Sequence, residues 1–377
     1  MFNDRPPCDT QANHSASASH PPFDSRSNRI HSRKANAGFA NAHYLDLEGS
    51  CSHPLERRLS DSENAQNHRG RLAPISTSSI KAIHALRRMH GGSQSQLMLG
   101  DDGRLWVVKF KNNPQHLKTL ANELMATRIA ESIGLSVPKS AIIDVTQELI
   151  ESNPHLFIDH GRGWREICSS GLQFGSSWSG TLMPGQVIDI LPEEQLQRLR
   201  NLEEFAGMLA FDKWTSNADR RQAVFQRTAR TNQYSAVFVD QGFCFNAGEW
   251  SFQDMPQRGV FERKSVYSVV TDWDSFEPWL TRIEQFSPDV LWKIARTVPP
   301  EWYWEDLYLL EESVETLLVR RYGVRKLISE LRQSSDTPFP NWKNGRSASM
   351  PRFQLEVASG GQVDVTTQPS CWRQQWG

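Results

Sequence analysis

The chain is organised around residues 211–225, which read FDKWTSNADRRQAVF. This stretch gathers two carboxylates (Asp212 and Asp219), an amide and two guanidinium groups into one short segment. An apolar, helix-like run precedes it at 205–211, and a strand-like run follows it at 234–239. So many polar groups between a helix and a strand make a poor core element. They are well suited to orient a phosphate, a metal ion and a hydroxyl.

Composition places the chain among ordinary globular proteins. Its 377 residues can form one large domain or two modest ones, and a net charge of −1 gives no sign of a nucleic-acid or membrane-surface partner. The five cysteines are scattered without a Cys-x-x-Cys pair, so neither a disulfide framework nor a zinc site is predicted, and a cytoplasmic location is expected. No apolar run approaches the roughly 20 residues of a membrane span.

Three regions differ in composition. Residues 1–74 are rich in Ser, Asn, His, Arg and Pro and are predicted to be disordered, although an overlong translation start explains them equally well. An ordered domain is expected over 75–331, with a first lobe over about 75–160 and a second over about 190–331. Residues 332–377 are rich in Pro, Ser and Gln and are predicted to form a loose tail.

The first lobe is predicted to consist mainly of strands. Residues 79–87 alternate apolar and polar side chains, which is the period of a half-buried strand. A glycine-rich turn follows at 90–96, a tight turn at 101–103 and a further strand at 104–111. From about 117 to 133 the apolar residues recur at helical spacing.

The glycine-rich turn is a candidate phosphate-binding loop. Gly91 and Gly92 allow backbone N–H groups to approach a phosphate without obstruction by side chains, and Ser93 and Gln94 can add donors. The alternative is an ordinary turn between two strands.

Lys109 and Glu123 form the next candidate pair. A lysine on the strand behind a glycine-rich turn resembles the lysine strand of protein kinases. Lys111 shares the same strand face, and we prefer Lys109 because both of its neighbours are apolar. Glu123, in the middle of the following helix, can reach back and hold that lysine. The alternatives are an edge-strand lysine that discourages aggregation and a solvated helix glutamate.

The central stretch offers two carboxylates for one role. Asp219 lies beside Arg220 and Arg221, and positive charges keep a carboxylate ionised, as a base that positions an alcohol must be. Asp212 and Asn217 have the Asp-x-x-x-x-Asn spacing of the kinase catalytic loop, in which the asparagine binds a metal. The alternatives are a helix-terminal aspartate and a solvated pair of arginines.

Asp240 is the candidate metal ligand. It ends the apolar strand 236–239 and is followed by Gln241 and Gly242. An aspartate in this position suits a magnesium ion that bridges two phosphates, and the alternative is a simple turn. The order of all these signals along the chain, from glycine-rich turn to Asp-x-Gly, is that of a two-lobed kinase.

In that order the residues resemble the HipA-like kinase family, distant relatives of the phosphatidylinositol lipid kinases and the protein kinases. The resemblance extends over residues 75–331. It rests on five segments, GGSQSQ at 91–96, WVVKF at 106–110, NELMATRIAESIGL at 122–135, DKWTSNADRR at 212–221 and VDQG at 239–242.

The resemblance implies an α+β, two-lobed, protein-kinase-like fold. The N-lobe would have a small antiparallel β-sheet and one helix, and the C-lobe would be mainly helical. ATP and Mg²⁺ would be the cofactors, and the γ-phosphoryl group would pass to a hydroxyl, taken as a protein Ser or Thr. Lys109 would hold the α- and β-phosphates, Glu123 would orient Lys109, and the amides of residues 92–94 would cover the phosphates.

The same resemblance assigns the metal ligands and the base. Asp240 would bind magnesium with help from Asn217 or Gln222, and Asp219 would position the acceptor hydroxyl, with Asp212 as the rival. The better-known branch of the family has an asparagine five residues after the catalytic aspartate, where this chain has Val224. A nucleotide-binding pseudokinase or interaction module without catalysis is therefore the alternative function. The sequence names neither the acceptor nor an oligomeric state.

Overall fold

The structure, a computed structural model, describes residues 77–89, 91–116, 118–178, 187–227, 233–303 and 306–343. All of these residues belong to one compact unit of the chain. The predicted disordered segment 1–74 and residues 344–377 of the predicted tail lie outside the described residues.

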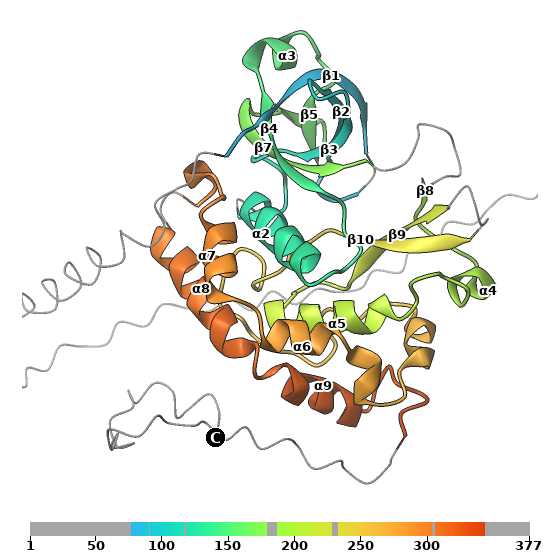
Figure 1. The fold of residues 1–377 in the computed structure, drawn as a ribbon. Helices are drawn as coiled ribbons and strands as arrows, with labels where there is room; N and C mark the ends of the chain where they lie inside the picture. The colour runs from blue at the N-terminus through green and yellow to red at the C-terminus, as the bar shows by residue number, and fades with distance from the viewer. Residues whose placement is uncertain are drawn as a thin grey trace, which may run out of the picture. The chain divides into compact units, whose positions relative to one another are not determined.

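The N-lobe is built on a small β-barrel (Figure 1). Its strands close in the order β1 (Ile80–Arg88), β2 (Gln96–Gly100), β3 (Leu105–Lys109), β7 (Gly171–Ser177) and β4 (Ser140–Val145). The pairs are antiparallel except for β1 with β4, which run parallel and close the barrel. The small, mainly antiparallel sheet confirms the predicted fold class. The closure was not foreseen, because strand periodicity does not identify pairing partners.

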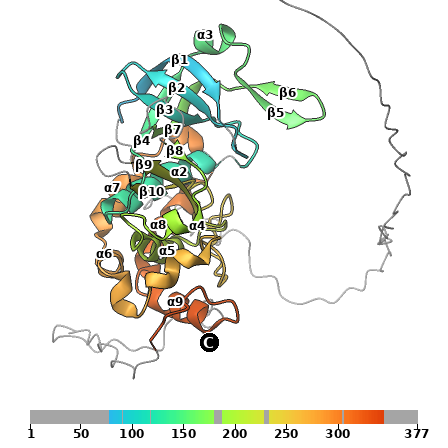
Figure 2. The ribbon, with the colours of Figure 1, turned by 90° about the vertical axis from the view of Figure 1, so that its right-hand side faces the viewer.

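Two smaller pieces extend the barrel. Helix α3 (Gln147–Glu151) follows β4, and the hairpin of β5 (Phe157–Gly161) and β6 (Trp164–Ile167) forms a separate two-stranded sheet. Figure 2 shows this hairpin projecting from the side of the barrel.

Helix α2 (Thr119–Ser132) packs between the barrel and the helical lobe (Figure 1). Buried residues lie on all its sides, including Leu120, Leu124 and Ile129. The helix is followed by Gly134, which adopts a left-handed conformation (φ +83°) and donates its N–H to the carbonyl of Glu131. Such a glycine is a common way to end a helix.

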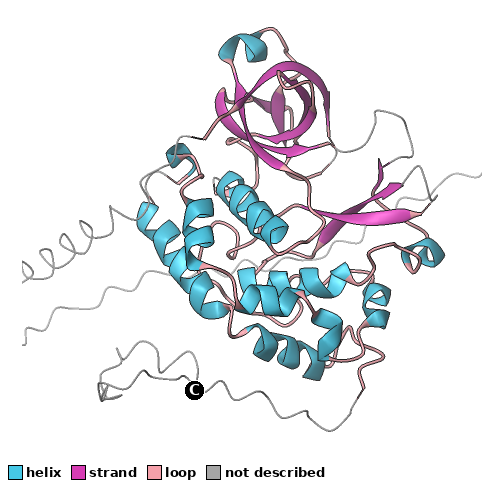
Figure 3. Cartoon of the chain, in the orientation of Figure 1, coloured by secondary structure: helices cyan, strands magenta, loops and turns pink. Residues whose placement is uncertain are grey.

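The C-lobe is mainly helical, as Figure 3 shows by the separation of strands from helices. Its α-helices are α4 (Glu193–Leu196), α5 (Glu204–Thr215), α6 (Trp279–Glu284), α7 (Pro288–Ala295), α8 (Leu307–Arg320) and α9 (Val324–Gln333). The described part of the lobe also has the short 3₁₀ helices η1 (Lys264–Val269), η2 (Trp273–Phe276) and η3 (Pro300–Trp302). A small sheet of β8 (Val187–Ile188), β9 (Gln222–Arg227) and β10 (Tyr234–Val239) completes the lobe. This arrangement confirms the predicted two-lobed α+β fold.

The packed part of the C-lobe extends beyond residue 331. Helix α9 runs to Gln333, Phe339 is only 4% exposed, and the Trp342 ring centroid lies 5.4 Å from that of Trp273. Residues up to 343 therefore differ from the loose tail expected from 332 onward. The polar composition of this region gave no sign that Phe339 and Trp342 anchor it. Aromatic side chains bury a large area each, so two of them can hold a polar segment in place.

Of the helices in the described part of the chain, none combines the length and the hydrophobicity that crossing a membrane requires.

Helix α5 is the centre of the C-lobe core, and it is buried from Phe205 to Thr215. It can pack closely against α6 because Gly207 has no side chain. A Cβ atom at this position would overlap the indole ring of Trp279.

We predict that Gly207→Ala destabilises the protein, although alanine is the better helix former. Overpacking a tight core costs about 1–3 kcal/mol, which exceeds the gain of up to about 1 kcal/mol from helix propensity. Urea unfolding of the purified chain measures the change. If the indole is the cause, Gly207→Ala should cost less in a Trp279→Leu background than in the wild type. Equal costs in both backgrounds would contradict this explanation.

Candidate functional site

Lys109 lies at the centre of a buried cluster of charges. Its Nζ donates to Oε1 of Glu123 and, at 2.9 Å, to Oδ1 of Asp240. Lys109 ends β3, Glu123 lies on α2, and Asp240 directly follows β10. The fold therefore brings together three residues that the sequence singled out from distant parts of the chain.

Electrostatics give the members of this cluster different roles. Burial disfavours the charge of Lys109, but the attraction of Glu123 and Asp240 outweighs it and raises the pKa of Lys109. Burial likewise opposes ionisation of Asp240, but the charge of Lys109, the hydrogen bonds with Lys109 and Glu123 and the charge of Arg221 together outweigh it, so the pKa of Asp240 is lowered. For Glu123 burial dominates and raises its pKa, with Asp240 acting in the same direction against Lys109. Asp240 is thus the carboxylate that holds its charge, and its side chain is 18% exposed.

Burial distinguishes Lys109, the last residue of β3, from Lys111, which lies two residues beyond the strand. Lys111 has a third of its side chain exposed, and its Nζ lies 3.7 Å from Oε1 of Glu301. It makes a loose surface pair of a kind that contributes little. Lys109 is the buried lysine, as its apolar neighbours indicated.

Asn122 is a site residue that the sequence analysis missed. It lies beside Glu123 on α2, is fully buried, and donates its Nδ2 to the carbonyls of Gly242, Cys244 and Ala247 at 2.8–2.9 Å. Oε2 of Glu123 accepts the N–H of Gln241 at 3.0 Å. Helix α2 is therefore bonded to the loop after Asp240. The sequence held one signal for this role, an amide side chain on a helix with many apolar residues. A buried polar group must find hydrogen-bond partners.

The β9–β10 hairpin places Asp219 and Asp240 at the same end. Gln222 at the start of β9 pairs with Val239 at the end of β10. Because the strands are antiparallel, the residues just before β9 and just after β10 lie side by side. Asp240 has a left-handed backbone (φ 62°), which turns the chain out of the strand. A Cβ on Gly242 would lie 2.9 Å from Thr119, so only glycine lets this loop approach α2.

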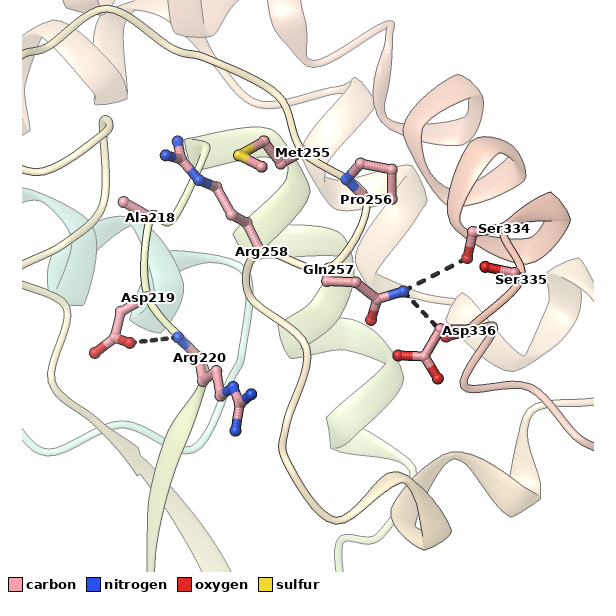
Figure 4. Close-up of a pocket in the computed structure, with 10 residues that line it drawn as sticks. All are labelled: Ala218, Asp219, Arg220, Met255, Pro256, Gln257, Arg258, Ser334, Ser335 and Asp336. Atoms are coloured by element: carbon pink, nitrogen blue, oxygen red, sulfur yellow. Dashed lines mark hydrogen bonds between the residues drawn. The ribbon is translucent and has the colours of Figure 1, made fainter. Parts of the chain in front are cut away.

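Asp219 is half-buried and is one of the residues that line a cavity of about 580 Å³ (Figure 4). Its Oδ1 accepts the N–H of Arg220 at 2.7 Å, and its Oδ2 lies 3.5 Å from Nε2 of Gln222. The backbone carbonyl of Asp219 accepts the N–H of Gly259. The loop is thus fixed while the carboxylate stays accessible. Asp219 lines this cavity, but Lys109, Glu123 and Asp240 do not. The cavity therefore lies outside the buried charge cluster.

Asp212 is much less exposed than Asp219, the other candidate for the catalytic base. Its side chain is fully buried and forms an ion pair with Arg221, whose Nε donates to Oδ2 at 2.9 Å. Nδ2 of Asn217 donates to Oδ1 of Asp212 at 2.9 Å. Arg221 also donates to the carbonyl of Val239, which joins α5 to the hairpin. The spacing of Asp212 and Asn217 therefore reflects a structural bond.

The candidate metal ligands differ in their availability. Asn217 is 1% exposed, and its Oδ1 accepts the N–H of Asp219 at 3.1 Å, so its amide is engaged at both ends. Gln222 is exposed at the start of β9. Among the described residues no group of three or more His, Cys, Asp or Glu side chains is gathered for a metal. Mg²⁺ is commonly held by one or two carboxylates together with nucleotide phosphates, and Asp240 fits that requirement.

Gln94 anchors the glycine-rich loop, because both ends of its side-chain amide are hydrogen-bonded. Its Nε2 donates to the carbonyl of Asp159 at 2.7 Å, and its Oε1 accepts the N–H of Asp159 at 2.8 Å. The N–H of Gln94 donates to the carbonyl of Gly91, and Ser93 is bonded to Ser95. The loop is therefore tied to β5. Sequence alone does not show this bond, because Asp159 lies 65 residues away.

Several solved structures resemble the chain. The Golgi casein kinase with Mn and ADP bound shares 13% identity over 72% of this chain and 77% of that one, with a TM-score of 0.39. The Helicobacter pylori proinflammatory kinase CtkA shares 14% identity over 65% of this chain and 99% of that one, with a TM-score of 0.41. HipA of Shewanella oneidensis, in a complex with HipB and operator DNA, shares 12% identity over 72% and 73%, with a TM-score of 0.34.

Among curated proteins no match was found. The family comparison is more direct, because the sequence profile of the HipA-like kinases matches residues 82–325. This match includes every candidate residue from Gly91 to Asp240 and covers well over half of the 377 residues. The chain therefore belongs to the HipA-like kinase family.

Proposed function

We propose that this chain is an ATP- and Mg²⁺-dependent kinase that transfers the γ-phosphoryl group to a serine or threonine hydroxyl of a protein. Membership of the family supports a kinase-type function. The observation that carries the proposal is the buried contact of Lys109 with both Glu123 and Asp240. A lysine held by a helix glutamate beside a metal-binding aspartate is the arrangement that phosphoryl transfer requires.

On the nucleotide side, Lys109 would bind the phosphates and Glu123 would hold it in place. Glu123 is itself fixed by the N–H of Gln241, so its position depends on the loop that carries Asp240. Asp240 would hold Mg²⁺, with the amide oxygen of Gln222 as a second donor. The ion would supply the positive charge that stabilises the phosphates during transfer.

On the acceptor side, Asp219 would accept a hydrogen bond from the acceptor hydroxyl. The hydroxyl oxygen forms the new bond to the γ-phosphorus, the bond to the β–γ bridging oxygen breaks, and the hydroxyl proton passes to Asp219. The accessible carboxylate of Asp219 supports this assignment. Asp212 would act only by holding the loop through Arg221.

A second candidate function is nucleotide binding without transfer. It is favoured by Val224, which stands where the better-known branch has asparagine, and by Asn217, whose amide is already engaged. Thermal stabilisation by ATP and Mg²⁺ without phosphoryl transfer to any protein or to the chain itself would favour this candidate over the first.

The proposal includes a cytoplasmic location. The two cysteines in the described part of the chain, Cys168 and Cys244, are buried free thiols, and buried thiols suit a reducing compartment.

Lys109→Ala and Asp240→Ala should each lower the transfer of ³²P from labelled ATP by about 10² or more, because the phosphates and the metal lose their partners. Lys111→Ala, two residues beyond the end of β3, is the matched control, and it should retain most of the activity. Circular dichroism checks that each variant is folded. Full activity in Lys109→Ala or Asp240→Ala would contradict the assignment.

Asp219→Asn and Asp212→Asn should separate chemistry from stability. Asp219→Asn should keep the wild-type free energy of unfolding while kcat falls by about 10²–10⁴, since only the base is lost. Asp212→Asn breaks a buried ion pair and should lower the free energy of unfolding by about 3–5 kcal/mol. Urea unfolding and the labelled-ATP assay measure both quantities. The reverse pattern would reassign the base to Asp212.

A further inference from the structure

The loop of residues 240–252, which begins at Asp240, has a strained backbone. Six of its non-glycine residues adopt the left-handed conformation, with φ between 50° and 62°, namely Asp240, Phe245, Asn246, Ala247, Trp250 and Phe252. L-amino acids disfavour this conformation because the Cβ atom comes too close to the following carbonyl oxygen. Such a backbone persists only where the surrounding structure holds it. The contacts that hold this loop therefore control where Asp240 lies.

The amide of Asn122 supplies four of these contacts. Its Nδ2 donates to the carbonyls of Gly242, Cys244 and Ala247 at 2.8–2.9 Å, so its two N–H bonds are shared among three acceptors. Its Oδ1 accepts the indole N–H of Trp250 at 2.6 Å. Both polar atoms of this fully buried side chain are thus bonded to the same loop.

Trp250 is itself fixed near the start of α2. It is 5% exposed, and Nζ of Lys118 lies 4.7 Å from the centroid of its ring. A cation at this distance from an indole ring is attracted to its face. Lys118 directly precedes α2 and also forms an ion pair with Asp306 at 2.9 Å. Two residues at the start of α2, Lys118 and Asn122, therefore hold the same tryptophan.

The same loop is bonded to the segment that carries Asp219. The N–H of Ala218, directly before Asp219, donates to the carbonyl of Phe243 at 2.9 Å. Two more backbone bonds, at 2.7 and 3.0 Å, run from the N–H groups of Phe245 and Asn246 to the carbonyls of Thr215 and Ser216. A displacement of this loop would therefore move both candidate aspartates, Asp240 at its start and Asp219 beside it.

We propose that Asn122 is a positioning residue for phosphoryl transfer. By binding residues 242–250 it holds the strained loop, so that Asp240 and Asp219 keep their places relative to Lys109. Its neighbour Glu123 binds Lys109 directly, so one turn of α2 fixes both the lysine and the two aspartates. The inference rests on the proposed function for the roles of the aspartates, but the hold of Asn122 on the loop can be measured without catalysis.

Two substitutions each remove part of these contacts. Trp250→Phe keeps an aromatic ring and removes only the indole N–H. Asn122→Asp keeps the acceptor for that N–H and removes the donors to the three carbonyls. Trp302→Phe is the matched control, because Trp302 is also buried and its indole N–H donates to the carbonyl of Leu172 at 3.1 Å, outside the loop.

Hydrogen exchange of the full-length chain, followed by mass spectrometry, measures the loop in the absence of nucleotide. In Trp250→Phe and Asn122→Asp, peptides that cover residues 215–219 and 243–247 should exchange about tenfold or more faster than in the wild type. In Trp302→Phe they should exchange at the wild-type rate. Trp250→Phe is the milder change, and it carries the test if Asn122→Asp does not fold.

Calorimetry with ADP, with and without Mg²⁺, measures the consequence for the site. The Kd of metal-free ADP should stay within about twofold of the wild type in both variants, because Lys109 and Glu123 are unchanged. The gain in ADP affinity that Mg²⁺ produces should fall by about tenfold, because Asp240 is no longer held. A purely structural role for Asn122 would not separate these two quantities.

The outcomes separate this inference from the proposed function. Wild-type exchange rates in Trp250→Phe, or an unchanged effect of Mg²⁺ in that variant, would overturn the role of Asn122 and leave the kinase proposal standing. A wild-type chain that binds no ADP, or binds it without an effect of Mg²⁺, would overturn the proposed function and with it the part of Asn122 in transfer.

Discussion

The buried contact of Lys109 with Glu123 and Asp240 is the constraint on which the rest of the structure depends. A charged side chain in the interior is tolerated only when partners surround it. Here the partners come from α2 and from the end of β10, so the barrel, the helix and the hairpin must all meet at this point. One surplus negative charge remains in the cluster if both carboxylates ionise. That surplus is what a Mg²⁺ ion held by Asp240 would offset.

A second buried pair performs a different task. Asp212 and Arg221 are almost completely enclosed, and breaking such a pair is costly because the remaining charge has no partner. The pair ties α5 to the hairpin and keeps the intervening loop in one conformation. Asp219 lies on that loop and keeps an accessible carboxylate beside the cavity. The two aspartates, seven residues apart, therefore have different roles. Asp212 anchors the loop, and Asp219 is the candidate base.

Sequence alone predicted the elements that depend on local pattern and order. The lysine strand, the glutamate helix and the strand that ends at Asp240 each carry a clear period, and their order along the chain indicated the fold. Features that depend on contacts between residues far apart in the sequence could not be predicted. The burial of Arg221, the bond of Gln94 to Asp159 and the three carbonyls held by Asn122 each join residues that no local pattern connects. The burial of Phe339 could not be predicted for the same reason, because its neighbours in the sequence are mostly polar.

The most direct test of the account is a crystal structure of the chain with a non-hydrolysable ATP analogue and Mg²⁺. The account predicts phosphate oxygens within hydrogen-bond distance of Nζ of Lys109 and a metal ion bound to the carboxylate of Asp240. Glu123 should remain paired with Lys109 in that complex. A nucleotide bound elsewhere, or a complex in which neither Lys109 nor Asp240 touches the phosphates or the metal, would contradict it.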